Sequence, residues 1–330
     1  MSGKKQSVQN QKLSNRCIAA FEAALDKRQS LFTQTNALRL VNSHGDFIPG
    51  IVVEQYHRHF AVHQFAEAAS EDVLAICDHI AAKFAPEYLV VKPRNRLDGK
   101  EYSAEQAKVL INRNGSRSVV TEHGVLFAVD LNDTMNTGLF LDMRQNRQLV
   151  ARQSQGKEVL NCFAYTCSFG VHCRAANAAR VVNVDISAKI LERGKENYAL
   201  NALGTHEHEF VRADTIRYLA GALKHENRFD CIVLDPPTFS RHDKEVFSVS
   251  KEIPGILDKA FSLLKPQGTI LAATNCSKIP PEILKTHIYN AAHSSGKEII
   301  KITRLGQDVD FPGSNTMKES FLSCYLVKIG

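Results

Sequence analysis

The stretch FDCIVLDPPTFS, residues 229–240, decides the fold. Its first six residues form an apolar run of strand length, and Asp235 follows directly. Pro236 and Pro237 have no backbone N–H to donate, so the strand ends there and a stiff loop carries the acid. In open α/β sheets, ligands bind beyond the carboxyl ends of the strands. A carboxylate, a rigid turn and the ring of Phe239 suit a planar nitrogen heterocycle, and an ordinary Asp-Pro turn is the alternative.

Strand and helix patterns alternate around this stretch from residue 157 onward. Strand patterns occupy 157–163, 180–185, the run ending at Asp214, 229–234 and 268–274, and helical patterns lie between them. This alternation predicts an α/β fold with a Rossmann-like, mostly parallel sheet. The last two strand patterns, 298–303 and 321–329, predict an antiparallel edge strand.

The preceding half of the chain predicts a smaller α+β domain. Residues 1–15 are basic and polar, and we expect them to be disordered, whereas 16–28 has helical spacing. Short strand patterns with Gly and Pro punctuation fill 36–65, before a helix over 69–84 and a strand over 87–92. We therefore predict a flexible basic tail and helix over 1–30, an α+β central domain over 31–135 and a larger α/β domain over 136–330.

Composition indicates a cytoplasmic protein. The 330 residues carry a formal net charge of +6 and contain no apolar run long enough to cross a membrane, and the N-terminus does not resemble a secretory signal. The eight cysteines form no C-x-x-C pair, so we expect reduced thiols and no metal site. The mild positive charge is compatible with a polyanionic partner and does not establish one.

Acids recur at the ends of successive predicted strands: Asp185, Asp214 and Asp235. Asp185 lies about 20 residues beyond the first turn, where a carboxylate takes ribose hydroxyls, and Asp214 is placed for an adenine amino group. The turn AYTCSFG has one glycine, so it is a poor pyrophosphate cradle. A nucleoside without phosphates fits better, and S-adenosylmethionine is such a ligand. Each acid alone is also compatible with a turn or a helix N-cap.

A basic segment precedes this domain. Residues 92–118 contain seven Lys and Arg against three Asp and Glu, and Arg94 and Arg96 lie near its start. These charges predict contacts with RNA phosphates, and a solvated loop face is the equal alternative.

Several motifs carry a family resemblance. VLNCFAYTCSFGVH, NVDIS, RADTIRYL, DPPTFS and TNCS, preceded by NTGLFLDMRQNR, resemble the class I S-adenosylmethionine-dependent rRNA methyltransferases. The most similar branch is the bacterial large-subunit rRNA cytosine-5 methyltransferase family, and the resemblance runs from about residue 36 to the end. It implies S-adenosylmethionine as cofactor and large-subunit rRNA as partner.

The resemblance also implies site residues. The segment that closes over the cofactor would contain Phe140, Asp142 and Arg144. The first loop would contain Phe163, Tyr165 and Thr166. Asp185 would bind the ribose, Asp214 the adenine and Asp235 the edge of the target base, with Pro236, Pro237 and Phe239 beside it.

The chain departs from the family pattern in three places. Cys167 and Ser168 stand where the family loop carries glycine, which crowds the loop near the methionine part of the cofactor. Asn177-Ala178-Ala179 replaces the usual Gly-Gly-Ala before the second strand. We also expect the family's N-terminal PUA domain to be missing, since few residues precede the central domain. RNA contact would then fall to the central domain, the basic segment or the tail, and a homodimer is left open.

The role of Cys276 depends on which atom of the base is methylated. Cytosine carbon 5 becomes nucleophilic after a thiolate adds to carbon 6, and a carboxyl group at ring nitrogen 3 stabilises the developing charge. Cys276 follows the strand after Asp235, so adjacent parallel strands would bring both to one place. A buried structural cysteine is the alternative. DPPTFS also resembles guanine-nitrogen methyltransferases, which need no such cysteine, and the third hypothesis is a non-catalytic RNA- or nucleotide-binding protein.

Overall fold

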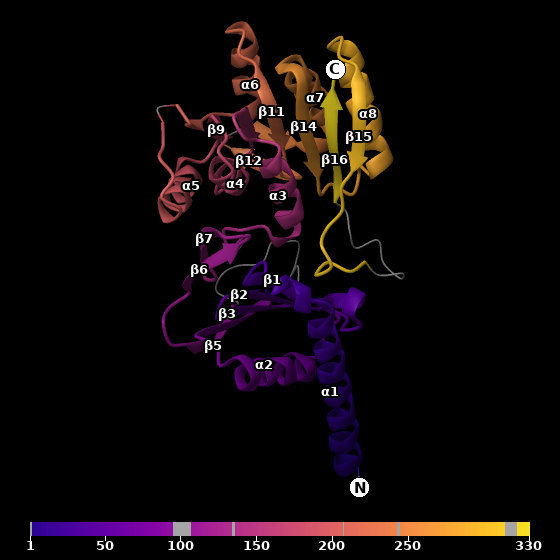
Figure 1. The fold of residues 1–330 in the computed structure, drawn as a ribbon. Coiled ribbons are helices and arrows are strands. Elements are labelled where there is room, and N and C mark those ends of the chain that lie inside the picture. The colour runs from indigo at the N-terminus through magenta and orange to yellow at the C-terminus, as the bar shows by residue number, and fades with distance from the viewer. Residues whose placement is uncertain (1, 95–106, 134–135, 207, 243–244, 314–321) are drawn as a thin grey trace. The chain divides into compact units, whose positions relative to one another are not determined.

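The computed structural model describes residues 2–94, 107–133, 136–206, 208–242, 245–313 and 322–330. The chain divides into two compact units (Figure 1). The first unit comprises Met1–Arg144 and Asp308–Glu319, and the second comprises Gln145–Gln307 and Ser320–Gly330. The first unit therefore extends past residue 135 and includes a segment from near the C-terminus.

The first unit is built on a five-stranded sheet in the order β1-β2-β3-β4-β5. Its strands are β1 (Ala37–Asn42), β2 (Ile51–Tyr56), β3 (His59–Gln64), β4 (Tyr88–Pro93) and β5 (Lys108–Asn112), and a separate hairpin joins β6 (Arg117–Glu122) to β7 (Val125–Asp130). Only β3 and β4 pair in parallel within the described part of this sheet.

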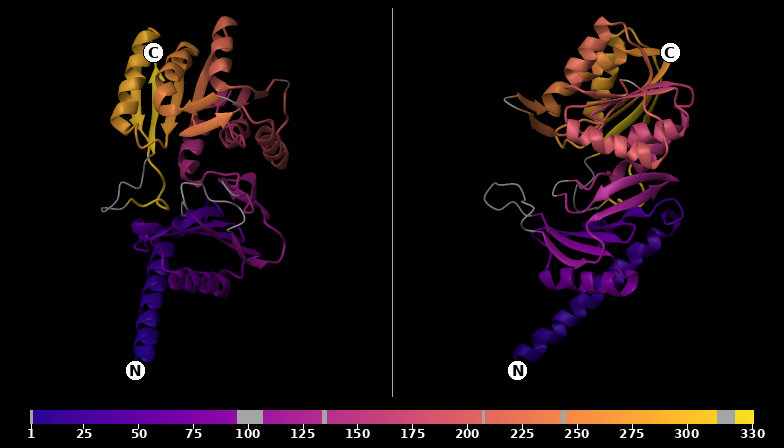
Figure 2. Two further views of the ribbon diagram at one scale, coloured as in Figure 1. Left: turned by 180° about the vertical axis from the view of Figure 1, so that it is seen from behind. Right: turned by 90° about the vertical axis from the view of Figure 1, so that its left-hand side faces the viewer.

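Two helices cover one face of this sheet, α1 (Ser2–Lys27) and α2 (Ser70–Phe84) (Figure 2). Phe21 and Leu25 of α1 are four residues apart, so they lie on one side of the helix and pack into an apolar cluster with Phe60 of β3 and Ile80 of α2. The prediction of disorder for residues 1–15 is wrong, since α1 begins at Ser2.

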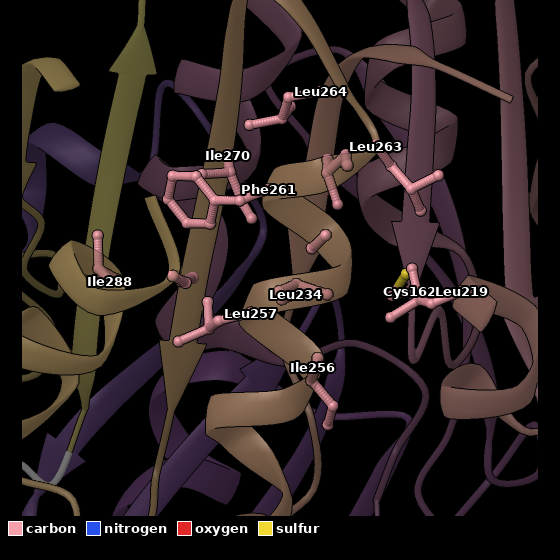
Figure 3. Close-up of a cluster of buried hydrophobic side chains, with 14 of the residues drawn as sticks. Cys162, Leu219, Leu234, Ile256, Leu257, Phe261, Leu263, Leu264, Ile270 and Ile288 are labelled. Carbon is pink, nitrogen blue, oxygen red and sulfur yellow. The ribbon is translucent and has the colours of Figure 1, made fainter. Parts of the chain in front are cut away.

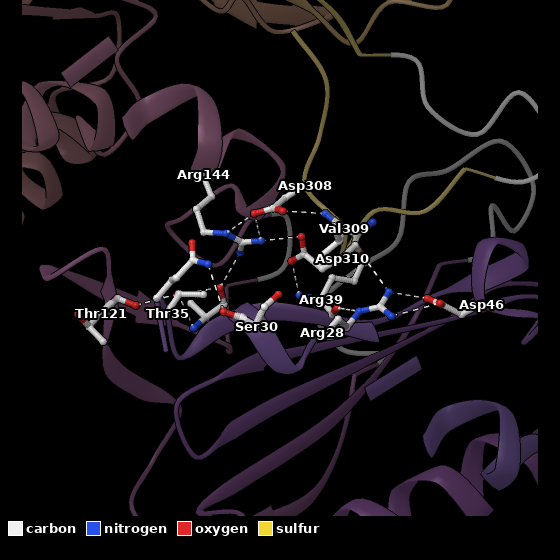
Figure 4. A network of polar contacts seen from close by, with 12 residues as sticks. Arg28, Ser30, Thr35, Arg39, Asp46, Thr121, Arg144, Asp308, Val309 and Asp310 are labelled. Atoms are coloured by element: carbon white, nitrogen blue, oxygen red, sulfur yellow. Dashed lines mark hydrogen bonds and ion pairs between the residues drawn. The ribbon is translucent and has the colours of Figure 1, made fainter. Parts of the chain in front are cut away.

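The segment from near the C-terminus joins the first unit through buried ion pairs (Figure 4). Arg144 is fully buried, and its guanidinium contacts the carboxylates of Asp308 and Asp310. Arg28 is also fully buried, and it pairs with Asp46 and donates to the carbonyl of Asp310. Each buried charge therefore has a countercharge, as burial in a low-dielectric interior requires.

The second unit contains a seven-stranded sheet in the order β10-β9-β8-β11-β14-β16-β15. Its strands are β8 (Glu158–Cys162), β9 (Arg180–Asp185), β10 (Phe210–Arg212), β11 (Phe229–Leu234), β14 (Leu264–Thr274), β15 (Ile299–Arg304) and β16 (Ser323–Ile329). The first five are parallel, and β16 runs antiparallel between β14 and β15. The predicted Rossmann-like, mostly parallel sheet is confirmed. The strand that runs against the others is β16, however, and not the edge strand, because β15 pairs with its outer side.

Helix α3 (Arg144–Arg152) precedes β8, and the other helices lie between the strands: α4 (Ser168–Ala175), α5 (Ala188–Leu200), α6 (Thr215–Lys224), α7 (Val249–Ser262) and α8 (Pro281–Ser294). The main apolar cluster joins α6, α7 and α8 to the central strands, with Leu219, Phe261 and Ile288 packed against Leu234 and Ile270 (Figure 3). The central strands are apolar along their length because helices bury them, as is usual for parallel sheets. None of the described helices is both long and apolar enough to cross a membrane.

Candidate active site

The carboxyl ends of three neighbouring strands place the predicted site residues at one level of the sheet. Cys162 of β8 pairs with Val184 of β9 and with Leu234 of β11. The next residue on each strand is therefore level, which aligns Asp185, Phe163 and Asp235. Neighbouring strands lie about 4.8 Å apart, so the two acids flank the first loop at about 10 Å from each other. The order of strand addition reverses between β8 and β11, where ligands of open α/β sheets bind.

The loop after β8 has an unusual backbone. Phe163, Tyr165 and Cys167 have positive φ angles of 53°, 49° and 60°. Such angles are costly for bulky residues and cluster at functional sites. The loop is held by the Ala164 N–H, which donates to the Val184 carbonyl at 3.0 Å, and by Asn197, whose side chain donates to the Thr166 carbonyl at 3.0 Å.

Cys167 is accommodated by a glycine on the next helix. The Cys167 side chain is fully buried, and a Cβ at Gly194 of α5 would lie 2.4 Å from its sulfur. The thiol thus fills the space that the missing side chain of Gly194 leaves, and burial raises its pKa well above the ordinary value. The larger side chain of Cys167 thus fits in this loop because Gly194 has no side chain to collide with it.

Asp185 contacts the first loop directly. One carboxylate oxygen accepts the Tyr165 N–H at 2.9 Å, and the other accepts the Ser187 N–H at 2.9 Å. Burial raises the pKa of Asp185, and these backbone donors oppose that rise. A carboxylate has about four acceptor sites, so hydroxyl groups of a ribose fit the remaining ones.

Asp185→Ala should weaken S-adenosylmethionine binding by roughly 1.5–3 kcal/mol, the scale of a hydrogen bond to a charged group. Calorimetric titration of the purified protein with the cofactor measures this change. Asp214→Ala provides a comparison at the next strand end. An unchanged affinity for Asp185→Ala would remove this carboxylate from the cofactor site.

Asp214 acts as the N-cap of α6. Its side chain accepts the Arg217 N–H at 2.9 Å, which satisfies a donor in the first turn of the helix. The N-cap interpretation of this acid is thus observed, and its contact with adenine stays a prediction.

The DPP segment has the predicted position after β11. Asp235 is half-buried, Pro236 is buried and Pro237 is exposed. Phe239 begins the short strand β12 (Phe239–His242), which pairs with β13 (Glu245–Ser248). The ring of Phe239 lies outside the described side chains. Phe247 of β13 instead contacts Phe163, with ring centroids 5.6 Å apart, and the sequence had not indicated this contact.

Cys276 follows β14, the strand beside that of Asp235, and is deeply buried. β11 and β14 are neighbours, with Leu234 level with Ala272, so Cys276 follows three residues after the level of Asp235. The predicted adjacency of the two strand ends is observed. The thiol is only 5% exposed and belongs to the main apolar cluster.

The segment predicted to close over the cofactor belongs to the first unit. Phe140 is 40% exposed and precedes the short helix η4 (Leu141–Met143), in which Asp142 is half-buried. Arg144 donates to the Ala37 carbonyl as well as to Asp308 and Asp310. Its guanidinium is thus occupied within its own unit, and a cofactor contact for these three residues stays a prediction.

The basic segment does not present all its charges to solvent. Lys92 is 2% exposed, and its ammonium donates to the Asp133 carbonyl at 2.7 Å. Burial and the nearby Arg94 lower the pKa of Lys92 to about 8. Counting Lys92 among the phosphate contacts was therefore wrong. Arg94 is half-buried and donates to His63 at 2.9 Å, and Arg96 lies outside the described residues.

No group of three His, Cys, Asp or Glu side chains in the described part of the chain is arranged to hold a metal ion. All eight cysteines are free and buried.

The strained loop, the strand-end acids and the sheet order define a class I methyltransferase. The sequence profile of the S-adenosylmethionine-dependent methyltransferase family matches residues 53–318, and the chain belongs to this family. It is therefore an enzyme, and S-adenosylmethionine is its cofactor.

Individual relatives agree with this assignment. Ribosomal RNA large subunit methyltransferase I of Aeromonas hydrophila is 31% identical over 300 residues, which cover 90% of this chain and 74% of that protein. Ribosomal RNA large subunit methyltransferase K of Neisseria meningitidis is 37% identical over 194 residues, which cover 58% and 53%. The crystal structure of the methyltransferase SMU.776 in complex with SAH gives a TM-score of 0.83 at 25% identity and covers 96% of this chain and 81% of that one.

Proposed function

We propose that this enzyme methylates large-subunit ribosomal RNA, at carbon 5 of a cytosine. The RNA substrate is supported by relatives named as ribosomal RNA large subunit methyltransferases. The observation that supports carbon 5 is that Asp235 and Cys276 follow the carboxyl ends of two adjacent parallel strands, β11 and β14. One strand supplies an acid for the base and its neighbour supplies a nucleophile.

The cofactor supplies an electrophilic methyl group, and the protein must make carbon 5 nucleophilic. The Cys276 thiolate adds to carbon 6, and the electron pair of the carbon 5–carbon 6 double bond becomes available at carbon 5. In its protonated form, the Asp235 carboxyl group donates a hydrogen bond to ring nitrogen 3 and stabilises the negative charge that develops on the ring. After carbon 5 has taken the methyl group, it loses its proton to a base, and the Cys276 sulfur leaves carbon 6.

The residues around the first loop fit the cofactor. Asp185 retains acceptor sites for ribose hydroxyls, and Phe163, Tyr165 and Thr166 lie on the loop that this carboxylate anchors. Asp214 would accept a hydrogen bond from the adenine amino group through the carboxylate oxygen that does not cap α6. Pro236, Pro237 and Phe239 would flank the target base beside Asp235.

One observation favours a second candidate, methylation at a guanine nitrogen. Cys276 is nearly inaccessible and packs among apolar side chains, as a structural cysteine does. DPPTFS suits this reaction equally well, because Asp235 can accept hydrogen bonds from the edge of guanine without a cysteine nucleophile.

Transfer to RNA distinguishes the two candidates. We expect the purified enzyme to transfer labelled methyl groups from S-adenosylmethionine to 23S rRNA from a strain that lacks the gene. Mass spectrometry of the digested nucleosides should then show 5-methylcytidine. Methylguanosine would establish the second candidate, and no transfer to any rRNA would contradict the proposed substrate.

A further inference from the structure

Phe47 is displayed to solvent to an unusual degree. It is 81% exposed, and the next most exposed large apolar side chain among the described residues is Ile300, at 54%. Phe47 follows the short helix η2 (Ser43–Asp46) and lies between two buried residues, Asp46 and Ile48. A ring between two buried neighbours is held outward by the fold.

The backbone at Phe47 is also unusual. Its φ angle is +61°, a left-handed conformation that is a clear outlier for a bulky residue. The Phe47 N–H donates to the His44 carbonyl, and the Ile48 N–H donates to the Ser43 carbonyl, both at 3.1 Å. The neighbouring contacts therefore impose this conformation, and an outlier of this kind is a reason to look for function.

The opposite side of the turn is fixed by close packing. A Cβ at Gly45 would lie 2.1 Å from the Pro312 carbonyl oxygen, so only glycine allows this approach. Arg28 pairs with Asp46 in the interior of the unit. The turn is thus anchored beneath Phe47.

One cation lies beside the ring. The Lys27 ammonium lies 5.7 Å from the centre of the Phe47 ring, and its side chain is 50% exposed. It also lies 3.7 Å from a carboxylate oxygen of the buried Asp46, whose main partner is Arg28. The Lys27 side chain is therefore held near the ring while half of it remains accessible to a ligand.

Resting on the RNA substrate proposed above, we infer that Phe47 and Lys27 form a docking site for an unpaired RNA base, with Phe47 stacking on the base and Lys27 contacting an adjacent phosphate. Exposed aromatic rings beside cationic side chains recognise single-stranded RNA because every base has a flat face and every nucleotide a negative charge. The half-exposed Lys27 ammonium beside the ring favours this occupant over an apolar peptide. The site lies in the unit that contains none of Asp185, Asp235 and Cys276, so it serves RNA binding and not the reaction.

Fluorescence anisotropy with a labelled single-stranded RNA of about 12 nucleotides tests this inference across a range of salt concentrations. Phe47→Ala should weaken binding roughly 5- to 150-fold, the range for loss of one base–aromatic stack, without changing the salt dependence. Phe47→Trp should keep the affinity, whereas Phe47→Leu should lose it, because leucine is apolar but cannot stack. Lys27→Ala should reduce the slope of log affinity against log salt by about 0.7.

The controls separate this inference from the proposed function. Leu74→Ala, at a side chain of α2 that is 51% exposed, should bind RNA as the wild type does. Unchanged S-adenosylmethionine affinity in Phe47→Ala would show that the variant is folded. A wild type that binds no RNA would overturn both proposals. A wild type that binds RNA, with Phe47→Ala or Phe47→Leu binding equally well, would overturn this inference alone. So would loss of a dimer in Phe47→Ala by sedimentation, because Phe47 would then contact a second copy of the chain.

Discussion

Cys276→Ala should abolish methyl transfer to cytosine and leave the affinity for S-adenosylmethionine unchanged. The cysteine acts on carbon 6 of the base, so its removal takes away the step that activates carbon 5 and no contact with the cofactor. Transfer assays and calorimetric titration measure the two quantities separately. Asp235→Asn should lower kcat more than it weakens RNA binding, since Asp235 stabilises charge that develops in the transition state.

A covalent trap makes this prediction specific. In RNA containing 5-fluorocytosine, carbon 5 carries no proton to lose, so the enzyme should remain attached to carbon 6. The wild type should form an adduct that survives denaturing electrophoresis, and Cys276→Ala should not. Cys324→Ala is the matched control, because Cys324 is a buried cysteine on the neighbouring strand β16. Full activity in Cys276→Ala would exclude the covalent mechanism and favour the guanine candidate.

Because Cys276 is buried, the adduct experiment also reports on a structural change in the protein. A thiol that is 5% exposed within an apolar cluster reaches the base only if the segment after β14 moves. The Cys276 N–H donates to the Thr274 hydroxyl at 3.1 Å, and its carbonyl accepts the Ile279 N–H at 2.9 Å. Adduct formation would therefore show that these contacts open when RNA binds.

Arg144→Ala should lower the free energy of unfolding by about 3–5 kcal/mol, the typical cost of leaving a buried charge without its partner. Asp310 is fully buried and Asp308 nearly so, and both depend on this guanidinium. Burial raises the pKa of Asp310 even with Arg144 present, so removal of the arginine leaves the carboxylate less stable still. Urea unfolding measures the change.

Two further variants help to explain a change in the unfolding free energy of Arg144→Ala. Arg152→Ala removes an exposed arginine from the last turn of the same helix and should change stability by no more than about 0.5 kcal/mol. Arg144→Lys should recover part of the lost stability. Lysine restores the positive charge, but its ammonium lacks the planar guanidinium that donates to Asp308 and Asp310 together. Unchanged stability in Arg144→Ala, together with weaker cofactor binding, would support the cofactor role that the family resemblance implies.

Much of the second unit was predictable because its signals are local. An apolar run that ends in an acid marks the carboxyl end of a parallel strand, and helices between such runs imply the sheet. The sequence therefore correctly predicts Asp185 and Asp235 at the carboxyl ends of parallel strands. Asp214 was correctly given a capping alternative, since an N-cap needs only the residues that follow it.

The other features depend on contacts between distant residues. Lys92 looks like a surface charge in the sequence, but it lies on a buried strand and donates to a carbonyl 41 residues away. Arg144 meets Asp308 and Asp310 across separations of 164 and 166 residues, and no local pattern marks that pairing. The helix before residue 16 was missed because its sequence is polar and has no apolar stripe.

The ion pairs of Arg28 and Arg144 have a consequence for how the protein is made. The first unit consists mostly of residues 1–144, yet its residues Asp308 and Asp310 are translated after residues 145–307 of the second unit. While the ribosome is still adding residues 145–307, Arg144 has neither of these two carboxylates to pair with. The first unit therefore acquires these partners only after every strand of the second unit's sheet except β16 has been translated.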